Sequence, residues 1–137
     1  MKLEHLNLVV KDIHSMINFY KSAFPHWYVR AKGKSDWYGV ERNWVHFGDD
    51  FQYLTFNSNG QGENRDLEGH ETGLAHFAYV VSNLESVNNR LLETGFKPRA
   101  SSENKYRKNI YFIDPRGYEV EFVEYYSDIP VERNSDQ

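Results

Sequence analysis

The segment LEHLNLVV, residues 3–10, occurs again as LAHFAYVV, residues 74–81. His5 of the first copy matches His76 of the second at an offset of 71 residues (76 − 5), and the same offset relates Ser15 to Ser86. An internal repeat predicts two copies of one supersecondary unit. Each copy has the pattern of a strand followed at once by a helix, with a histidine at the same place in the strand. The repeat therefore predicts two imidazoles at equivalent positions around one centre.

The composition limits both the class of protein and the class of ligand. The 137 residues suffice for one structural domain that folds alone. Lys and Arg are scattered and the formal net charge is −4, so nucleic acid is not an expected partner. Without cysteine, only histidine, carboxylate, amide or phenol groups could hold a metal. No apolar run approaches the roughly 18 residues that span a membrane, and we expect a cytoplasmic protein without membrane contacts.

The first copy is predicted to form a βαβββ module over residues 1–57. Residues 3–10 alternate like a half-buried strand, and Asp12 is suited to cap a helix that ends before Pro25. Three further strands are expected at residues 27–31, 37–47 and 51–56, with KGKSD between the first two and the turn GDD between the last two. Residues 58–72, which are rich in Gly, Asn and acidic residues, are predicted to link the two copies.

The second copy repeats this order over residues 73–126. A strand at 74–81 precedes a helix capped by Ser82 or Asn83 and closed by Gly95. DPRG is predicted to form a turn, and the polar tail 127–137 is expected to be frayed. Short strands of the second module are expected near residues 97–99, 109–113 and 118–124. The predicted fold class is therefore α+β, with two βαβββ modules that form a cupped mixed sheet with the helices outside.

Three side chains are predicted to meet on the concave face of this sheet. Strand alternation places His5 on the face opposite the first helix, and the repeat places His76 at the equivalent position. In the last strand, alternation turns Val120 and Phe122 toward the helix and Glu121 to the other face. Two imidazoles and one carboxylate can bind a divalent ion and leave positions open for water and substrate. We therefore predict a metal site formed by His5, His76 and Glu121.

These residues resemble a known family, the vicinal-oxygen-chelate superfamily, over residues 1 to about 126. The resemblance lies in the doubled βαβββ pattern, His5 in EHLNLVV, His76 in AHFAYVV, and Glu121 in YFIDPRGYEVEFVE. Its members include glyoxalase I, extradiol dioxygenases, fosfomycin-resistance thiol transferases, methylmalonyl-CoA epimerase and the metal-free bleomycin-resistance proteins. The resemblance implies a divalent ion (Fe, Mn, Ni, Co or Zn) that holds two vicinal oxygens of a small substrate and acts as a Lewis acid.

Tyr53 departs from the pattern of glyoxalase I. Aligning FQYLTF (51–56) with EVEFVE (119–124) places Tyr53 opposite Glu121, where glyoxalase I-like members carry a carboxylate that binds the metal and takes the proton. A phenol with a pKa of about 10 is a poor base at neutral pH. Glyoxalase I activity is therefore less favoured, and Tyr53 is either a packing residue or a weak ligand or acid.

The remaining candidates are expected to line the cavity. Tyr111 and His46 occupy equivalent strand positions and could donate a proton or a hydrogen bond, so with Tyr53 they are the candidate catalytic residues. Each also has a simpler interpretation, as packing or as polar lining. The candidate substrate-binding residues are polar or aromatic side chains expected on the same wall or beside it: Asn7, Trp37, Phe51, Asn109 and Arg107.

Two functions from different classes remain open. The first is a divalent-metal-dependent enzyme acting on a small molecule with vicinal oxygens, either a glyoxalase-like lyase or isomerase or an extradiol-type dioxygenase. The second is a metal-free protein that sequesters a small molecule, as bleomycin-resistance proteins do, which the 16% aromatic content and Tyr53 favour. In both cases we expect a homodimer, in which the polar linker would also allow modules to be swapped between partners.

Overall fold

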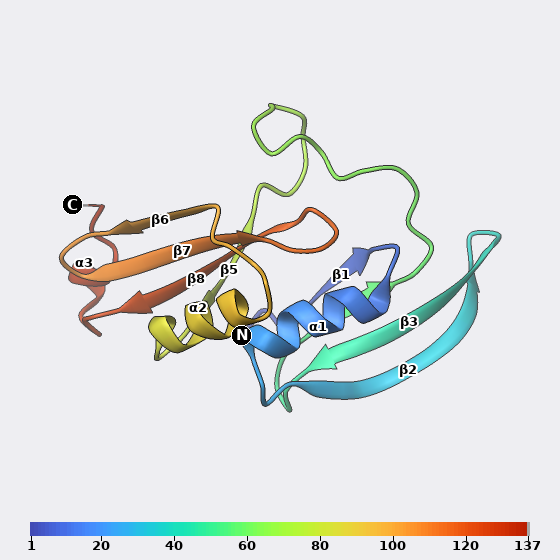
Figure 1. Ribbon diagram of the computed structural model, residues 1–137, viewed down its shortest axis with the longest axis horizontal. Coiled ribbons are helices and arrows are strands. Elements are labelled where there is room, and N and C mark those ends of the chain that lie inside the picture. The colour runs from blue at the N-terminus through green and yellow to red at the C-terminus, as the bar shows by residue number, and fades with distance from the viewer. Residues whose placement is uncertain (137) are drawn as a thin grey trace. The chain divides into compact units, whose positions relative to one another are not determined.

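The computed structural model describes residues 1–136 and divides the chain into two compact units (Figure 1). Unit 1 runs from Met1 to Glu63, and unit 2 begins at Asn64. Each unit holds one four-stranded sheet, in the order β1-β4-β3-β2 in unit 1 and β5-β8-β7-β6 in unit 2. The two orders are identical once the strands are counted within each unit. The duplicated α+β fold predicted from the sequence is therefore confirmed.

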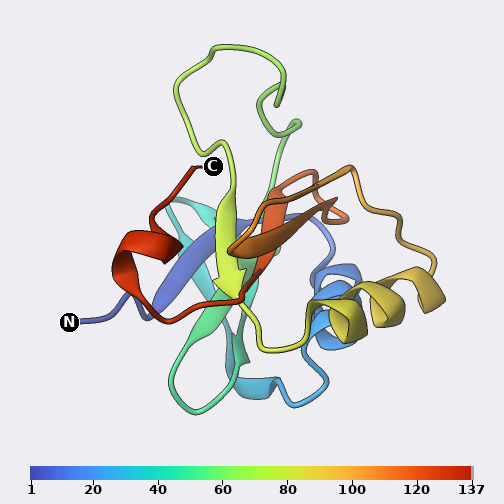
Figure 2. The same ribbon diagram turned by 90° about the vertical axis from the view of Figure 1, so that its left-hand side faces the viewer.

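Unit 1 has the predicted order of one helix and four strands. β1 is parallel to β4, whereas β3 is antiparallel to both β4 and β2, so the sheet is mixed. The loop at residues 58–76, between the last strand of unit 1 and the first of unit 2, contains no helix or strand (Figure 2). The elements of unit 1 are β1 (His5–Val9), α1 (Ile13–Ala23), β2 (Tyr28–Trp37), β3 (Val40–Gly48) and β4 (Tyr53–Asn57).

α1 covers one face of this sheet and forms the core of unit 1. Asp12 caps the helix by accepting the backbone N–H of His14 at 3.0 Å, as the sequence predicts. The fully buried Tyr20 packs against Phe56 of β4, with ring centroids 5.9 Å apart. Helix α1 packs against β3 and β4, which leaves the other face of the sheet free of this helix (Figure 1). Leu8, Val45, Phe47 and Leu54 complete the buried apolar layer.

The β2–β3 hairpin differs from the sequence prediction. The polar segment KGKSD was expected to be a loop, but it lies inside β2, and the chain turns at Tyr38 and Gly39 instead. Both turn residues have positive φ, 51° and 85°, which a two-residue hairpin turn with the strands' own twist requires. Gly33 within this segment is needed for packing, because a Cβ there would lie 2.6 Å from the Trp44 ring. The segment is polar because β2 is largely exposed.

Unit 2 repeats the architecture, with its first three strands shorter than their counterparts and its last strand longer. Asn83 caps α2 by accepting the N–H of Ser86 at 3.1 Å, and Gly95 follows the helix with a φ of 97°, as expected. The DPRG turn is closed by a hydrogen bond from the N–H of Gly117 to the carbonyl of Asp114 at 2.9 Å. The elements of unit 2 are β5 (Phe77–Val80), α2 (Leu84–Glu93), β6 (Ala100–Glu103), β7 (Arg107–Ile113), β8 (Glu119–Tyr125) and α3 (Pro130–Arg133).

Within residues 127–136, where a frayed tail is predicted, the chain forms the short helix α3, and Arg107 donates hydrogen bonds to the carbonyls of Arg133 at 3.2 Å and Ser135 at 3.1 Å. The polar sequence of the tail does not predict this contact, because the guanidinium binds backbone carbonyls rather than particular side chains. No helix within residues 1–136 has the length and apolar character needed to cross a bilayer.

Asp49 stabilises the turn between β3 and β4. Its carboxylate accepts the backbone N–H groups of Phe51 at 2.8 Å and Gln52 at 2.9 Å. Burial favours the neutral acid, but these hydrogen bonds and the nearby His26 favour the carboxylate, so the pKa of Asp49 is lowered from its ordinary 3.8. The turn therefore depends on the charged form of this side chain.

We expect Asp49→Ala to lower the free energy of unfolding by about 1–2 kcal/mol at neutral pH, because two backbone donors lose their acceptor. Since the folded-state pKa is depressed, the charge contributes stability above the unfolded-state pKa, and this contribution is lost as pH falls through the folded-state pKa. The difference between wild type and variant in urea denaturation should therefore narrow below about pH 4. A difference that stays constant down to pH 3 would contradict this role.

Candidate functional site

The predicted metal ligands of unit 2 lie together. His76, at the residue before β5, places Nε2 3.3 Å from Oε1 of Glu121, and its Nδ1 lies 3.9 Å from Oε1 of Glu119. β5 and β8 run parallel with Ala78 opposite Glu121, so both carboxylates project from β8 on the face that carries the histidine. Val120 and Phe122, between and beyond them, are fully buried. The predicted alternation along β8 is confirmed.

Glu121 is held by two neighbours on β7. Asn109, which is buried, donates a hydrogen bond from Nδ2 to Oε2 of Glu121 at 3.0 Å, which leaves Oε1 directed to His76. Tyr111 lies directly across the ladder from Glu121 and also hydrogen-bonds to its carboxylate. Burial, this hydrogen bond and the charge of Glu121 raise the pKa of Tyr111 to about 12. Tyr111 is therefore a neutral phenol at physiological pH and a hydrogen-bond donor.

Glu119 has a different partner. Its Oε2 accepts a hydrogen bond from Nη1 of Arg99 at 2.8 Å, and its side chain is only 9% exposed. Because this charge is already matched by a guanidinium, Glu119 is less available to a cation than Glu121 is. The two carboxylates of β8 thus have separate roles in the geometry, one paired with Arg99 and one facing His76.

In unit 1, His5 lies within an aromatic stack. Its ring is parallel to that of Tyr53 within 9°, with centroids 4.6 Å apart, and its Nδ1 lies 2.9 Å from Oε1 of Glu4. His46 stacks on Tyr53 at 4.7 Å. Burial, then the charges of His5 and Arg30, lower the pKa of His46, which favours its neutral form. His5 lies on the sheet face opposite α1, as predicted, with a side chain 42% exposed.

Arg30 was not among the predicted site residues. Its guanidinium carbon lies 4.3 Å from the centroid of the Tyr53 ring, close to the two histidines of the stack. The sequence does not predict on which face of the sheet Arg30 lies, because polar and apolar residues do not alternate regularly in the short segment around it. It reaches the stack through an irregularity in β2, where two residues oppose one on β3.

The strand register corrects the predicted equivalence of Tyr53 and Glu121. In unit 1, β1 pairs with β4 so that Asn7 lies opposite Thr55, and in unit 2 the matching residue, Ala78, lies opposite Glu121. Thr55 is therefore the counterpart of Glu121, and Tyr53 is the counterpart of Glu119. The predicted equivalence of His46 and Tyr111 holds, because they lie opposite Thr55 and Glu121 respectively.

The five predicted substrate-binding residues do not form one cluster in the structure. Asn109 belongs to the Glu121 cluster. Asn7 accepts a hydrogen bond from Asn57 at 2.5 Å on the same face as His5. Arg107 is engaged with the C-terminal segment, and Phe51 is 82% exposed in the β3–β4 turn, so the contacts of these two give no support to a role in binding substrate.

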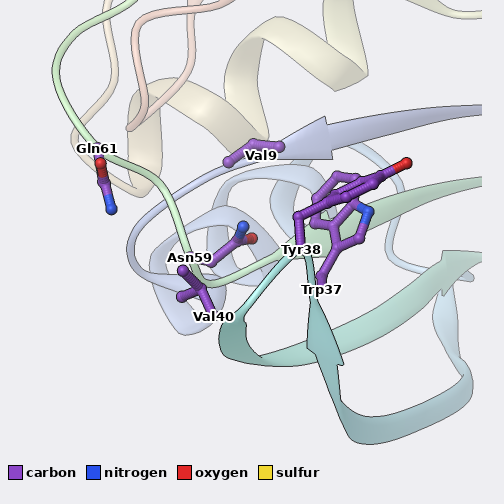
Figure 3. A pocket seen from close by; sticks show the side chains of 6 residues that line it. All are labelled: Val9, Trp37, Tyr38, Val40, Asn59 and Gln61. Atoms are coloured by element: carbon purple, nitrogen blue, oxygen red, sulfur yellow. The ribbon is translucent and has the colours of Figure 1, made fainter.

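Trp37 lines a shallow groove of about 350 Å³ in unit 1 (Figure 3). Its ring lies 5.9 Å from that of Tyr38, and the guanidinium of Arg42 lies 4.7 Å from its centroid. Oδ1 of Asn59, from the loop after β4, is buried there without a hydrogen-bond partner. The groove thus combines flat apolar surface with an amide acceptor. Its other lining residues are Val9, Val40 and Gln61.

The donors of unit 2 are compatible with a divalent ion. Two ligand atoms that each lie about 2.1 Å from an ion are about 3.0–3.4 Å apart in octahedral or tetrahedral geometry. The 3.3 Å between His76 and Glu121 falls in this range and suits either a direct hydrogen bond or a shared ion. Within unit 1, and within the described part of unit 2, no three His, Asp or Glu side chains form a metal site alone. The predicted set, with His5 from unit 1, stays a prediction.

Comparisons with known proteins agree with this fold. A glyoxylase/bleomycin resistance protein/dioxygenase domain from Frankia sp. EAN1pec has a TM-score of 0.76 at 17% identity, over 94% of this chain and 95% of that one. A glyoxalase family protein from Enterococcus faecalis has a TM-score of 0.72 at 19% identity, over 90% and 97%. FosX, a fosfomycin resistance protein from Listeria monocytogenes solved as a mutant with Mn(II) and a dihydroxypropylphosphonic acid, has a TM-score of 0.68 at 14% identity, over 97% and 98%.

These structural likenesses show the fold alone, and no curated protein matches the chain. The family model described as the Glyoxalase/Bleomycin resistance protein/Dioxygenase superfamily, however, matches residues 2–122, which include His5, His76, Glu121 and all strands except the end of β8. The chain therefore belongs to the Glyoxalase/Bleomycin resistance protein/Dioxygenase superfamily.

Proposed function

We propose that this protein is a divalent-metal-dependent enzyme that acts on a small molecule with vicinal oxygens. His5, His76 and Glu121 would hold the ion. The observation that carries the proposal is the arrangement of Glu121, whose Oε2 is fixed by Asn109 at 3.0 Å while Oε1 faces His76 at 3.3 Å. Metal-binding carboxylates are oriented by such hydrogen bonds from outside the ligand set. The Mn(II) complex of the related FosX fold adds support.

When bound, the ion would supply Lewis-acid polarisation of the substrate oxygens. The protein's own groups would orient the substrate and handle protons. Tyr111, protonated at neutral pH, can donate a hydrogen bond to a substrate oxygen beside Glu121 but cannot serve as a base there. His46 lies at the matching position of unit 1, and its lowered pKa keeps it neutral and able to accept a proton. These two groups suit a lyase, isomerase or dioxygenase reaction.

The test is a metal titration of chelator-treated protein. We expect one site per chain for at least one of Mn(II), Fe(II), Co(II), Ni(II) and Zn(II) by isothermal titration calorimetry. Replacing either histidine, in His5→Gln or His76→Gln, should weaken binding, whereas His26→Gln in an exposed loop should not. The absence of a stoichiometric site for all five ions would overturn the proposal.

Asn109 offers a separate prediction. We expect Asn109→Ala to weaken metal binding by about 10–100-fold, because Glu121 loses the hydrogen bond that fixes its orientation. Asn89→Ala, on the exposed face of α2, is the matched control and should leave the affinity unchanged. Calorimetric titrations of the two variants measure the difference. Equal affinities would show that Asn109 does not orient a ligand.

A second function is favoured by the groove beside Trp37. Flat aromatic surface and an unpaired amide oxygen suit a planar ligand with a hydrogen-bond donor, which a metal-free binding protein could sequester. The double variant His5→Ala, Glu121→Ala distinguishes the two functions. Unchanged affinity for such a ligand in the double variant would favour sequestration, whereas a loss would favour the metal-dependent enzyme.

A further inference from the structure

A β-bulge directs Arg30 to the face of the sheet that carries His5. In β2, Val29 pairs with Phe47 and Ala31 pairs with His46, so Arg30 is the extra residue between them. Val29 shares the face of the buried Phe47, and Ala31 shares the face of His46, so alternation along β2 does not by itself fix the face of Arg30. A bulge re-aims the side chain of the extra residue. Here the guanidinium lies over Tyr53, within the stack that contains both histidines of this unit's site.

The position leaves Arg30 without a matching anion. Its Nη1 is buried and finds no hydrogen-bond acceptor, and among residues 1–136 no carboxylate lies within 4 Å of its guanidinium nitrogens. Glu4, an acidic residue beside this cluster, is paired with His5 instead. The stack on Tyr53 at 4.3 Å supplies a cation–π contact, which holds the plane of the guanidinium but uses none of its five N–H donors.

A buried donor without an acceptor is costly in a folded protein, and more so when it carries charge. Arg42 shows the contrast within the same sheet. It also lies over an aromatic ring, that of Trp37, but its Nη1 donates to the side chain of Asn57. Arg30 has the same stacked arrangement with this acceptor missing. An anionic oxygen of a ligand could accept hydrogen bonds from the N–H groups of Arg30, whose guanidinium is already oriented by the ring of Tyr53.

We propose that Arg30 binds an anionic oxygen of the substrate, from a carboxylate or a phosphate-type group, beside His5. The inference rests on the proposed function in placing the substrate at His5. It narrows the substrate class to a small acid whose anionic group lies at Arg30. The acidic net charge of the chain makes a dedicated cation more necessary, because the protein as a whole repels anions.

The test uses full-length protein stripped of metal with a chelator, with inorganic phosphate and acetate as separate probes. Backbone amide shifts in ¹⁵N-correlated NMR spectra should change saturably at Ala31, His46 and Tyr53. Arg30→Gln should weaken binding of the preferred probe by about tenfold or more, the effect of losing a charge-assisted hydrogen bond. The probe that saturates at lower concentration identifies the anion as a carboxylate or as a phosphate-type group.

Lys32→Gln is the matched control, since it removes the same charge from an exposed position two residues further along β2. It should change the affinity by less than about twofold, because exposed charges at this distance are screened by salt. Arg30→Lys keeps the charge but lacks the planar fork, so weakening by severalfold in this variant supports the proposal even if Arg30→Gln fails to fold.

Equal binding in wild type and Arg30 variants, or shifts confined to other parts of the chain, would overturn the proposal. Because no metal is present, the result is independent of the metal titration. If the protein bound metal stoichiometrically but no anion, only the proposal for Arg30 would be rejected. If it bound the anion but no metal, the proposal for Arg30 would stand and the proposed metal-dependent enzyme would be rejected.

Discussion

Glu121→Gln is expected to weaken Mn(II) binding by about 100-fold or more, because loss of a group that merely orients a ligand already costs about 10–100-fold. Glutamine preserves the shape of the side chain and can still accept the hydrogen bond from Asn109. Only the negative charge and one anionic oxygen are lost, so the sheet should fold as before. Calorimetric titration of chelator-treated protein measures the affinity, and far-UV circular dichroism checks the fold.

Glu119→Gln provides the matched control for this prediction. It lies two residues away on the same face of β8, but its carboxylate is engaged by Arg99 at 2.8 Å and lies 3.9 Å from His76. We expect its metal affinity to stay within severalfold of the wild type, since Glu119 is not a predicted ligand. If Glu119→Gln lost binding and Glu121→Gln kept it, the ligand would have to be reassigned to the carboxylate that is the counterpart of Tyr53.

The choice between Glu119 and Glu121 as the metal ligand shows what strand alternation can and cannot predict. A period of two residues identifies the face of the sheet, and it correctly placed His5, Glu119 and Glu121 away from the helices. A shift of two residues preserves the face, so alternation cannot distinguish registers that differ by that amount. Aligning FQYLTF with EVEFVE therefore assigned Tyr53 to the wrong counterpart while leaving it on the correct face.

Other features escaped prediction because they depend on contacts between distant segments. The bulge at Arg30 requires knowledge of which β3 residues oppose β2, and a single strand sequence does not contain it. The capping residues Asp12 and Asn83 could be predicted because their partners lie two or three residues away. Local signals thus predicted the elements and the faces, whereas register and the unpaired cation required the assembled sheet.

Phe56→Ala is expected to lower the free energy of unfolding by about 3–5 kcal/mol, the range for removing a buried phenylalanine ring. Phe56 is fully buried in β4 and packs against Tyr20 of α1 and Phe47 of β3. The cavity would lie between helix and sheet, where neither can move without losing other contacts. All three tryptophans of the chain lie in unit 1, so urea unfolding followed by tryptophan fluorescence reports on this core.

Phe51→Ala is the matched control, because the same ring is removed five residues earlier from a turn where it is 82% exposed. We expect a change within about 0.5 kcal/mol, as for other exposed positions. Neighbours on a strand face opposite sides, so burial of Phe56 requires Tyr53 and Thr55 to face away from α1. Similar losses for the two variants would contradict the burial of Phe56 and, with it, the face on which Tyr53 stacks with His5 and Arg30.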